Sequence, residues 1–251
     1  MASKKVRDLP EDKIPRRSVL SDDVYELIKR MIFDHEIAPG NKVNIDAIAL
    51  KLEVSQTPVR EALASLESDG LIEKEPQKGY RATQLLSIKE LKDIYQFRLL
   101  IEPWAAEQAA KNIDKTTKAA LKAELQSAKT AIKFADQNRV EALTEHDTRF
   151  HTLIANISGN TSWADSFERT HCHLHLYRLY MAGKLKQIEG DSRSEIVLNL
   201  FEHYYQSNTA HLAFKEHELI VKSIIEENPK AARRAMHAHI ESSLKRLTSR
   251  Q

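Results

Sequence analysis

The sequence predicts a mainly α-helical protein of two domains that contains one small β-hairpin, and three observations lead to this fold class. Only 6 glycines and 7 prolines occur in 251 residues, which leaves few places for tight turns between strands. Apolar residues recur at intervals of three and four along most of the chain, as on the buried face of a helix. One stretch, LIEKEPQKGYRAT, instead alternates apolar and polar residues on both sides of PQKG. The length is enough for two ordinary domains.

The chain is expected to begin with a flexible basic arm, residues 1–17, which shows no apolar periodicity and carries several lysines and arginines. A first helix is expected over residues 18–35, where apolar residues form a stripe. The Pro39–Gly40 turn closes it. A second, short helix is expected over residues 44–52.

A third helix follows within Val54 to Ile72, VSQTPVREALASLESDGLI. Ser55 or Thr57 can cap its start, and Gly70 lies just past its end. Two short helices joined this closely, the second polar at its leading end, are typical of a helix-turn-helix that reads the major groove of DNA. The side chains expected to contact DNA from this element are Ser55, Gln56, Thr57 and Arg60.

The alternating stretch after Gly70 is expected to be the wing of a winged helix-turn-helix. In it, Lys78, Gly79 and Arg81 are candidates for contact with phosphate or the minor groove, although a plain structural hairpin has the same pattern. Residues 1–85 hold 14 Lys plus Arg against 15 Asp plus Glu, so total charge neither supports nor opposes DNA binding. The arm either contacts DNA or is merely solvated. Residues 18–84 are therefore the expected DNA-binding domain.

The second domain, residues 85–251, is expected to be an all-α bundle of six or seven helices. Breaks are expected at Ser158-Gly159-Asn160 and at Asn228-Pro229. The expected helices cover approximately residues 87–111, 116–136, 139–157, 162–182, 194–207, 209–227 and 229–249.

Four metal-ligating side chains are expected to point into this bundle. Asp147 and His151 lie four apart on one helical face, while His217 and His239 lie on the apolar stripes of two later helices. One Asp and three His from three helices suit a divalent transition metal. Each of these residues, taken alone, is also compatible with an ordinary hydrogen-bonded core residue.

The histidine run, residues 171–175, contains His171, Cys172, His173 and His175 and has two interpretations. His171 and His175 share a helical face and can bind a metal, but the alternation of His with Leu also fits a partly exposed helix. We expect an adventitious or structural role for the run. His175 or Tyr177 remains a candidate for lining an effector pocket.

The segment SQTPVREALASLESDGLIEKEPQKGYRAT, preceded by APGNKV, resembles the N-terminal domain of the GntR family of bacterial transcription regulators. Many relatives have Arg where this chain has Gln56, which bears on the operator that it prefers. A single winged helix reads only a few base pairs, so we expect a homodimer that binds a palindromic double-stranded DNA operator.

The second domain resembles the FCD ligand-binding domain of the FadR branch of that family, through Asp-x-x-Phe-His, Ser-Gly-Asn, EH-x-x-I and Met-x-x-His-Ile. That resemblance places the metal ligands at Asp147, His151, His217 and His239, and it implies zinc, with nickel or manganese as alternatives. Four protein ligands would leave one or two coordination positions of the metal open, and we expect a small organic acid as the effector that completes them. Arg98 and Glu102 match the opening helix, and Arg98 either holds the effector carboxylate or only pairs with Glu102 four residues away.

Composition excludes several other classes. No apolar run approaches the roughly 18 residues of a membrane span, and the N-terminus is charged where a signal peptide would be apolar, so we expect a cytoplasmic protein without a membrane partner. Cys172 is the single cysteine, which rules out an intrachain disulfide. We expect no enzyme. The rivals are a metal-dependent hydrolase with an accessory DNA-binding module, its base drawn from Glu145, Glu216 or His146, and a regulator whose metal is purely structural.

Overall fold

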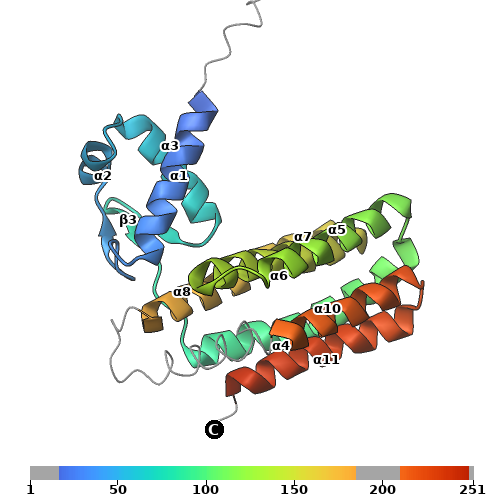
Figure 1. The fold of residues 1–251 in the computed structure, drawn as a ribbon. Helices are drawn as coiled ribbons and strands as arrows, with labels where there is room; N and C mark the ends of the chain where they lie inside the picture. Colours follow the sequence, from blue (N-terminus) through green and yellow to red (C-terminus); the bar gives the residue numbers. More distant parts are fainter. Residues whose placement is uncertain (1–16, 185–209, 249–251) are drawn as a thin grey trace, which may run out of the picture. The chain divides into compact units, whose positions relative to one another are not determined.

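The computed structural model describes residues 17–184 and 210–248 and divides the chain into two compact units, Met1–Thr83 and Gln84–Gln251 (Figure 1). Nearly all of the predicted basic arm and the predicted helix at residues 194–207 lie outside the described residues. The fold class matches the prediction: mainly α, with a helix-turn-helix and a small sheet in the first unit and a helical bundle in the second. Among the described helices, none is both long and apolar enough to cross a membrane.

Three helices form the body of the first unit: α1 (Arg17–Phe33), α2 (Ile45–Lys51) and α3 (Gln56–Ser68). α1 packs on α3 because both carry buried apolar residues at helical spacing, such as Val24 and Ile28 on α1 and Leu63 and Leu66 on α3. The Asn44 side chain caps α2 by accepting a hydrogen bond from the Ala47 amide.

The wing is part of a three-stranded antiparallel sheet rather than a lone hairpin. β2 (Ile72–Glu75) and β3 (Gly79–Ala82) pair as predicted from the alternating sequence. A two-residue strand, β1 (Lys42–Val43), pairs with the other edge of β3, giving the order β1-β3-β2. The sequence pattern predicts only a turn at residues 37–43, because a strand this short has no periodicity of its own.

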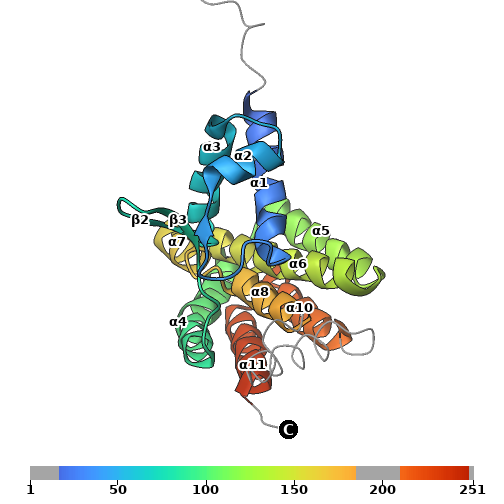
Figure 2. The ribbon, with the colours of Figure 1, turned by 90° about the vertical axis from the view of Figure 1, so that its left-hand side faces the viewer.

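The second unit consists of packed helices: α4 (Ile88–Asn112), α5 (Lys115–Ala131), α6 (Asp136–Ile157), α7 (Thr161–Glu168), α8 (Cys172–Lys184), α10 (Ala210–Ile225) and α11 (Pro229–Thr248). Both ribbon views show α4 and α11 side by side (Figures 1 and 2). Buried alanines on both helices, including Ala106 and Ala109 on α4 and Ala232 on α11, permit this close approach. A capping box between Ser87 and Glu90 fixes the start of α4.

One predicted helix is wrong in extent. The sequence pattern predicts a single helix over residues 162–182, whereas the structure ends α7 at Glu168 and starts α8 at Cys172. The backbone of His171 has a φ of 42°, in the left-handed region, which interrupts the helix without any Gly or Pro. As a result, the histidine run does not lie on one continuous helix with residues 161–168.

Candidate functional site

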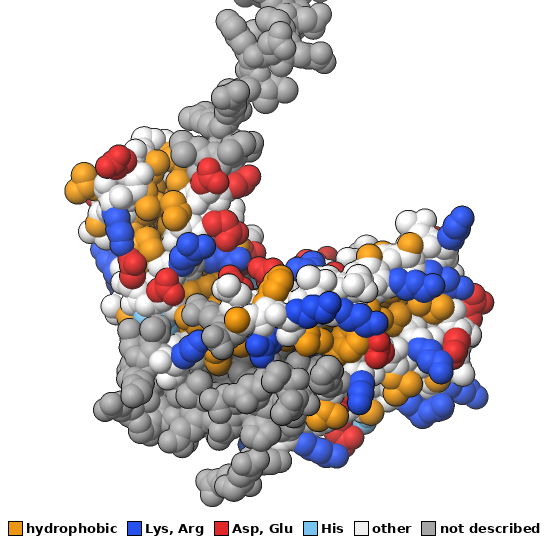
Figure 3. Space-filling model, viewed as in Figure 1, with side chains coloured by type: hydrophobic (Ala, Val, Ile, Leu, Met, Phe, Trp, Pro, Cys, Tyr) orange, Lys and Arg blue, Asp and Glu red, His pale blue; other side chains and the backbone are white. Residues whose placement is uncertain are grey.

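Three of the four residues predicted as metal ligands, His151, His217 and His239, bring ligand atoms within 4.8 Å of one another in the core of the bundle, and the fourth, Asp147, lies beside His217. Asp147 and His151 project from α6, one turn apart, and are met by His217 of α10 and His239 of α11. All four side chains are buried, with residue exposures of 5%, 2%, 1% and 3% in that order. On the face drawn in Figure 3, little histidine surface shows among the described residues of the bundle. We call Asp147, His151, His217 and His239 the site cluster.

The spacing of the donor atoms fits a first-row transition metal. The Nε2 atoms of His217 and His239 are 3.4 Å apart, and Nε2 of His217 is 3.8 Å from Oδ1 of Asp147. One ring nitrogen from each of the three histidines lies within 4.8 Å of the others. Tetrahedral Zn–N bonds of about 2.0–2.1 Å put two ligand atoms about 3.4 Å apart. The residues present therefore suit such an ion.

Burial favours the neutral, metal-binding form of two of these histidines, His151 and His217. Burial lowers the pKa of His217 well below its ordinary value, and the neighbouring histidines lower it further. Burial also lowers the pKa of His151, to about 4, although the Glu102 carboxylate acts in the opposite direction. Both imidazoles are thus neutral at neutral pH, as coordination requires.

Carboxylates lie behind two of the histidines. The Nδ1 atom of His239 is 2.8 Å from Oε2 of Glu216, which directs Nε2 toward His217. Nδ1 of His151 lies against the Glu102 carboxylate. Carboxylate partners of this kind orient metal-ligating histidines.

Arg98, a predicted effector contact, lies beside the site cluster. Its guanidinium pairs with Glu102 and is 1% exposed, and Nη2 is 3.4 Å from Nε2 of His151. Burial alone would raise the pKa of Glu102, but Arg98 and His151 outweigh it and lower that pKa to about 2. The predicted ion pair of Arg98 with Glu102 is therefore present, and it lies next to the proposed metal site, where Arg98 could also contact an effector.

Two members of the histidine run, for which the sequence predicts only an adventitious or structural role, lie close to the site cluster or to Arg98. His173 is buried and its ring stacks on His151 with centroids 5.2 Å apart. The Sγ atom of buried Cys172 lies 3.5 Å from Nη1 of Arg98. Of the other two predicted effector residues, His175 has its ring next to that of His171, and Tyr177 has its ring next to that of Tyr180. Cys172 and His173 follow the break at His171 and are buried, and no sequence signal marked that break.

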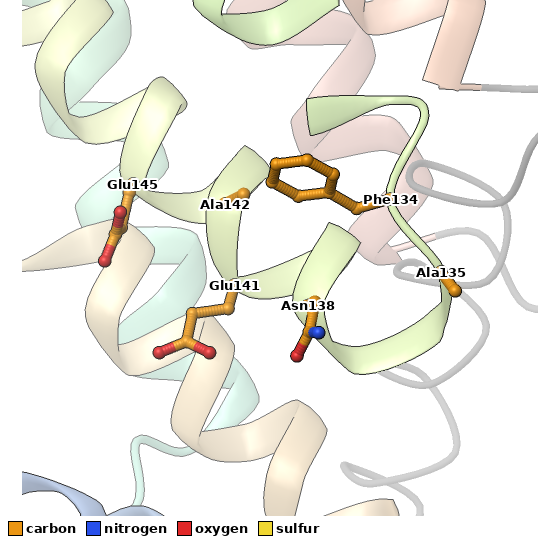
Figure 4. Close-up of a pocket in the computed structure, with 6 residues that line it drawn as sticks. All are labelled: Phe134, Ala135, Asn138, Glu141, Ala142 and Glu145. Carbon is orange, nitrogen blue, oxygen red and sulfur yellow. The ribbon is translucent and has the colours of Figure 1, made fainter. Parts of the chain in front are cut away.

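An open hollow of about 400 Å³ lies at the start of α6, and no residue of the site cluster is among those that line it (Figure 4). Two carboxylates, Glu141 and Glu145, line it together with Phe134, Ala135, Asn138 and Ala142. Because no cation is among these lining residues, the hollow does not suit an anionic effector.

At the start of α3, the predicted DNA contacts Ser55, Gln56, Thr57 and Arg60 are all exposed. Ser55 occupies the N-cap position, but its side chain makes no capping hydrogen bond, so the hydroxyl is not committed to the helix. The Gln56 amide donates to Asp46 of α2, and its carbonyl accepts from Nη2 of Arg60 at 3.2 Å. Gln56 therefore links Arg60 to α2 in this structure.

The wing residues differ among themselves. Lys78 is exposed, and Gly79 has a φ of 92°, a backbone conformation that side chains rarely adopt. Arg81 is half-buried; it pairs with Glu75 and donates to the Gly40 carbonyl at 2.5 Å. Lys78 is thus the most available cation of the three predicted wing contacts.

Family models match both units. Residues 20–82 match the model for bacterial regulatory proteins of the gntR family, and residues 93–242 match the FCD domain model. The transcriptional regulator YdhC of Bacillus subtilis is 26% identical over 215 residues, which cover 86% of this chain and 85% of YdhC. The regulator LutR of the same organism is 27% identical over 84% of this chain and 93% of its own. These relatives are transcription regulators, not enzymes.

Solved structures show the same fold. A GntR regulator from Rhodococcus sp. RHA1 superposes with a TM-score of 0.60 at 16% identity, covering 92% of this chain and 99% of its own. E. coli McbR/YncC superposes with a TM-score of 0.59 at 18% identity, covering 91% and 96%. The matched helix-turn-helix, the FCD domain and the buried histidine cluster agree with one another. The chain belongs to the GntR family, in the FadR branch with a C-terminal FCD domain, and is a DNA-binding transcription regulator.

Proposed function

We propose that this regulator holds one divalent transition metal ion in its bundle, responds to a small organic acid there, and binds a palindromic operator as a homodimer. The proposal rests on three buried histidines, His151, His217 and His239, whose ring nitrogens lie within 4.8 Å of one another, and on Asp147, which lies 3.8 Å from His217. Zinc is our first choice and nickel or manganese the alternatives, because an Asp and three His suit all three ions. A regulator that acts on a bacterial operator works in the cytoplasm, where we place this one.

When bound, the metal would supply a positive charge and open coordination positions for a carboxylate. Arg98 adds a second cation next to His151. Because Glu102 already pairs with Arg98, an incoming carboxylate must compete with Glu102 for the guanidinium. An effector that rearranges this pair would repack α4 against α6, and we propose that this repacking changes DNA binding.

The metal is tested by elemental analysis of the purified protein, which should find about one ion per chain. Mass spectrometry of the small molecules released on denaturation should then identify an organic acid. Finding metal but no acid, together with no response of DNA binding to added acids, would favour the purely structural metal.

A hydrolase is disfavoured by the positions of its candidate bases. Glu216 pairs with His239, and Glu145 is 3.6 Å from the exposed Arg149. His146 lies between Glu124 and His217. All three are thus engaged with other side chains, and only metal-dependent turnover by the purified protein would support a hydrolase.

DNA reading by α3 is tested at Arg60, the exposed cation at the leading end of the helix. Since one winged helix reads only a few base pairs, two copies are needed for useful specificity. We expect Arg60→Ala to weaken operator binding by about 1–3 kcal/mol in fluorescence anisotropy at moderate salt. Arg234→Ala, an exposed change on α11, is the control and should bind as the unchanged protein does. Molar mass from light scattering tests the homodimer.

A further inference from the structure

His146 is a buried histidine outside the set of four proposed ligands, and it contacts one of them, His217. It precedes Asp147 on α6 and is 2% exposed. Its Nε2 atom lies 3.0 Å from Nδ1 of His217, on the side of that ring opposite to the Nε2 that faces His239. Its Nδ1 atom lies 2.8 Å from Oε1 of Glu124, on α5.

Three side chains thus form one chain of hydrogen bonds from Glu124 through His146 to His217. We propose that His146 is a positioning residue that fixes the ring and tautomer of His217 for metal binding. The inference rests on the metal site proposed above and concerns a residue outside its ligand set.

The direction of the protons follows from the partners at each end. A carboxylate only accepts, so Nδ1–H of His146 must donate to Glu124. Neutral His146 then has its lone pair on Nε2, which accepts Nδ1–H from His217. His217 in turn keeps its lone pair on Nε2, the atom 3.4 Å from His239 and 3.8 Å from Asp147. With neutral rings, the relay leaves the metal-facing nitrogen of His217 free of a proton.

The far end of the relay is itself held in place. Arg149 donates to both oxygens of Glu124, at 3.1 Å from Nε to Oε2 and 3.1 Å from Nη2 to Oε1. The ring of Phe150 stacks on the ring of His217, with the centroids 4.0 Å apart. The imidazole of His217 is therefore fixed at its edge by His146 and on its face by Phe150.

His146 is also close enough to Asp147 and His217 to be considered a ligand itself, since the three offer donor atoms within 4.8 Å. The geometry favours positioning instead. Nδ1 of His217 faces His146, whereas Nε2 of His217 faces His239 and Asp147. A single ion cannot bind both nitrogens of that ring, so an ion at Nε2 of His217 is not also bound by His146 in this arrangement. To reach an ion bound at Nε2 of His217, the His146 side chain would have to break its hydrogen bonds with Glu124 and with Nδ1 of His217.

The test compares His146→Leu with His146→Gln in the full-length protein. Leu removes the relay, whereas the Gln amide can accept from His217 and donate to Glu124. Zinc affinity is measured by competition with a chromophoric chelator, and the ligand set by the absorption spectrum of the Co²⁺-loaded protein. His237→Leu, an exposed change on the same helix as His239, is the matched control.

We expect His146→Leu to weaken zinc binding about 10–100-fold while one ion per chain still binds, as for loss of a group that orients a ligand. His146→Gln should recover most of that affinity, and both variants should keep the wild-type Co²⁺ band positions. Glu124→Ala, which spares the core, should lower affinity in the same direction and serves if His146→Leu does not fold.

Several results would overturn the proposal. Wild-type affinity in His146→Leu and Glu124→Ala would remove the positioning role while leaving the metal site intact. Equal losses in the Leu and Gln variants would exclude the relay, and shifted Co²⁺ bands would make His146 a ligand. A wild-type protein that binds no metal would overturn the proposed metal function as well, which separates the two failures.

Discussion

Two groups of histidines in the bundle differ in how their separation along the sequence relates to the distance between their side chains. The site cluster draws its members from α6, α10 and α11, over a span of residues 147–239, yet its three histidines bring ring nitrogens within 4.8 Å of one another. The histidine run packs its members into residues 171–175, yet they diverge: His173 stacks on His151, and the ring of His175 lies by His171. Histidines that are close together in the sequence are thus a weaker indication of a metal site than side chains that point from different helices toward one point.

The largest effect should separate these two groups by metal content. His217→Ala removes a central ligand of the site cluster and should lower zinc affinity on the order of 1,000-fold or more. His171→Ala, in the run, should leave it unchanged. Elemental analysis after dialysis measures both. A variant lacking His217 that still carries one tightly held ion would show that the converging atoms are not the site.

The next effect concerns Arg98, which contacts both groups through His151 and Cys172. Arg98→Ala leaves the buried Glu102 carboxylate without its guanidinium and should lower the unfolding free energy by about 3–5 kcal/mol. The Lys89–Asp93 pair on the same helix has the same spacing but is exposed, so Lys89→Ala is the matched control. Urea unfolding compares them, and an equally small change in both variants would contradict the burial argument.

The part of the molecule that could be predicted is the part with local signals. α3 and the hairpin follow from helix spacing, from Gly70 and from alternation around PQKG. β1 could not be predicted, because Lys42 and Val43 become a strand only through their pairing with Arg81 and Tyr80. Likewise, the break at His171 has neither Gly nor Pro to announce it.

The candidate site likewise has a part that local sequence signals predict and a part that they do not. Helical spacing alone predicts that Asp147 and His151 share one inner face, and both side chains are buried there. His146 shows in the sequence only as a candidate base for a hydrolase, because its contact with His217 joins residues 71 positions apart. Periodicity assigns a residue to a face of its own helix, but it does not say which atom of another helix that face will meet.

A smaller effect should appear as a dependence of stability on pH. Burial, followed by Arg178 and His171, lowers the pKa of His175 to about 4. Between pH 6.5, the ordinary pKa of histidine, and pH 4, His175 binds a proton in the unfolded chain but not in the folded chain. The free energy of unfolding therefore falls as the pH drops from 6.5 toward 4. At pH 5 the loss from this residue should be about 1–2 kcal/mol. His175→Gln should flatten the curve by that amount in urea unfolding, and an unchanged slope would contradict it.

The smallest effect should come from His173, the member of the histidine run whose ring contacts the site cluster. Its ring stacks on His151, but the donor atoms that lie together belong to His151, His217 and His239. His173→Phe keeps a buried aromatic ring and should change zinc affinity by less than about threefold, because it alters packing and no ligand. The same chelator competition measures it. A loss as large as that of His217→Ala would mean that α8 supplies a ligand, and the boundary drawn between the two histidine groups would then be wrong.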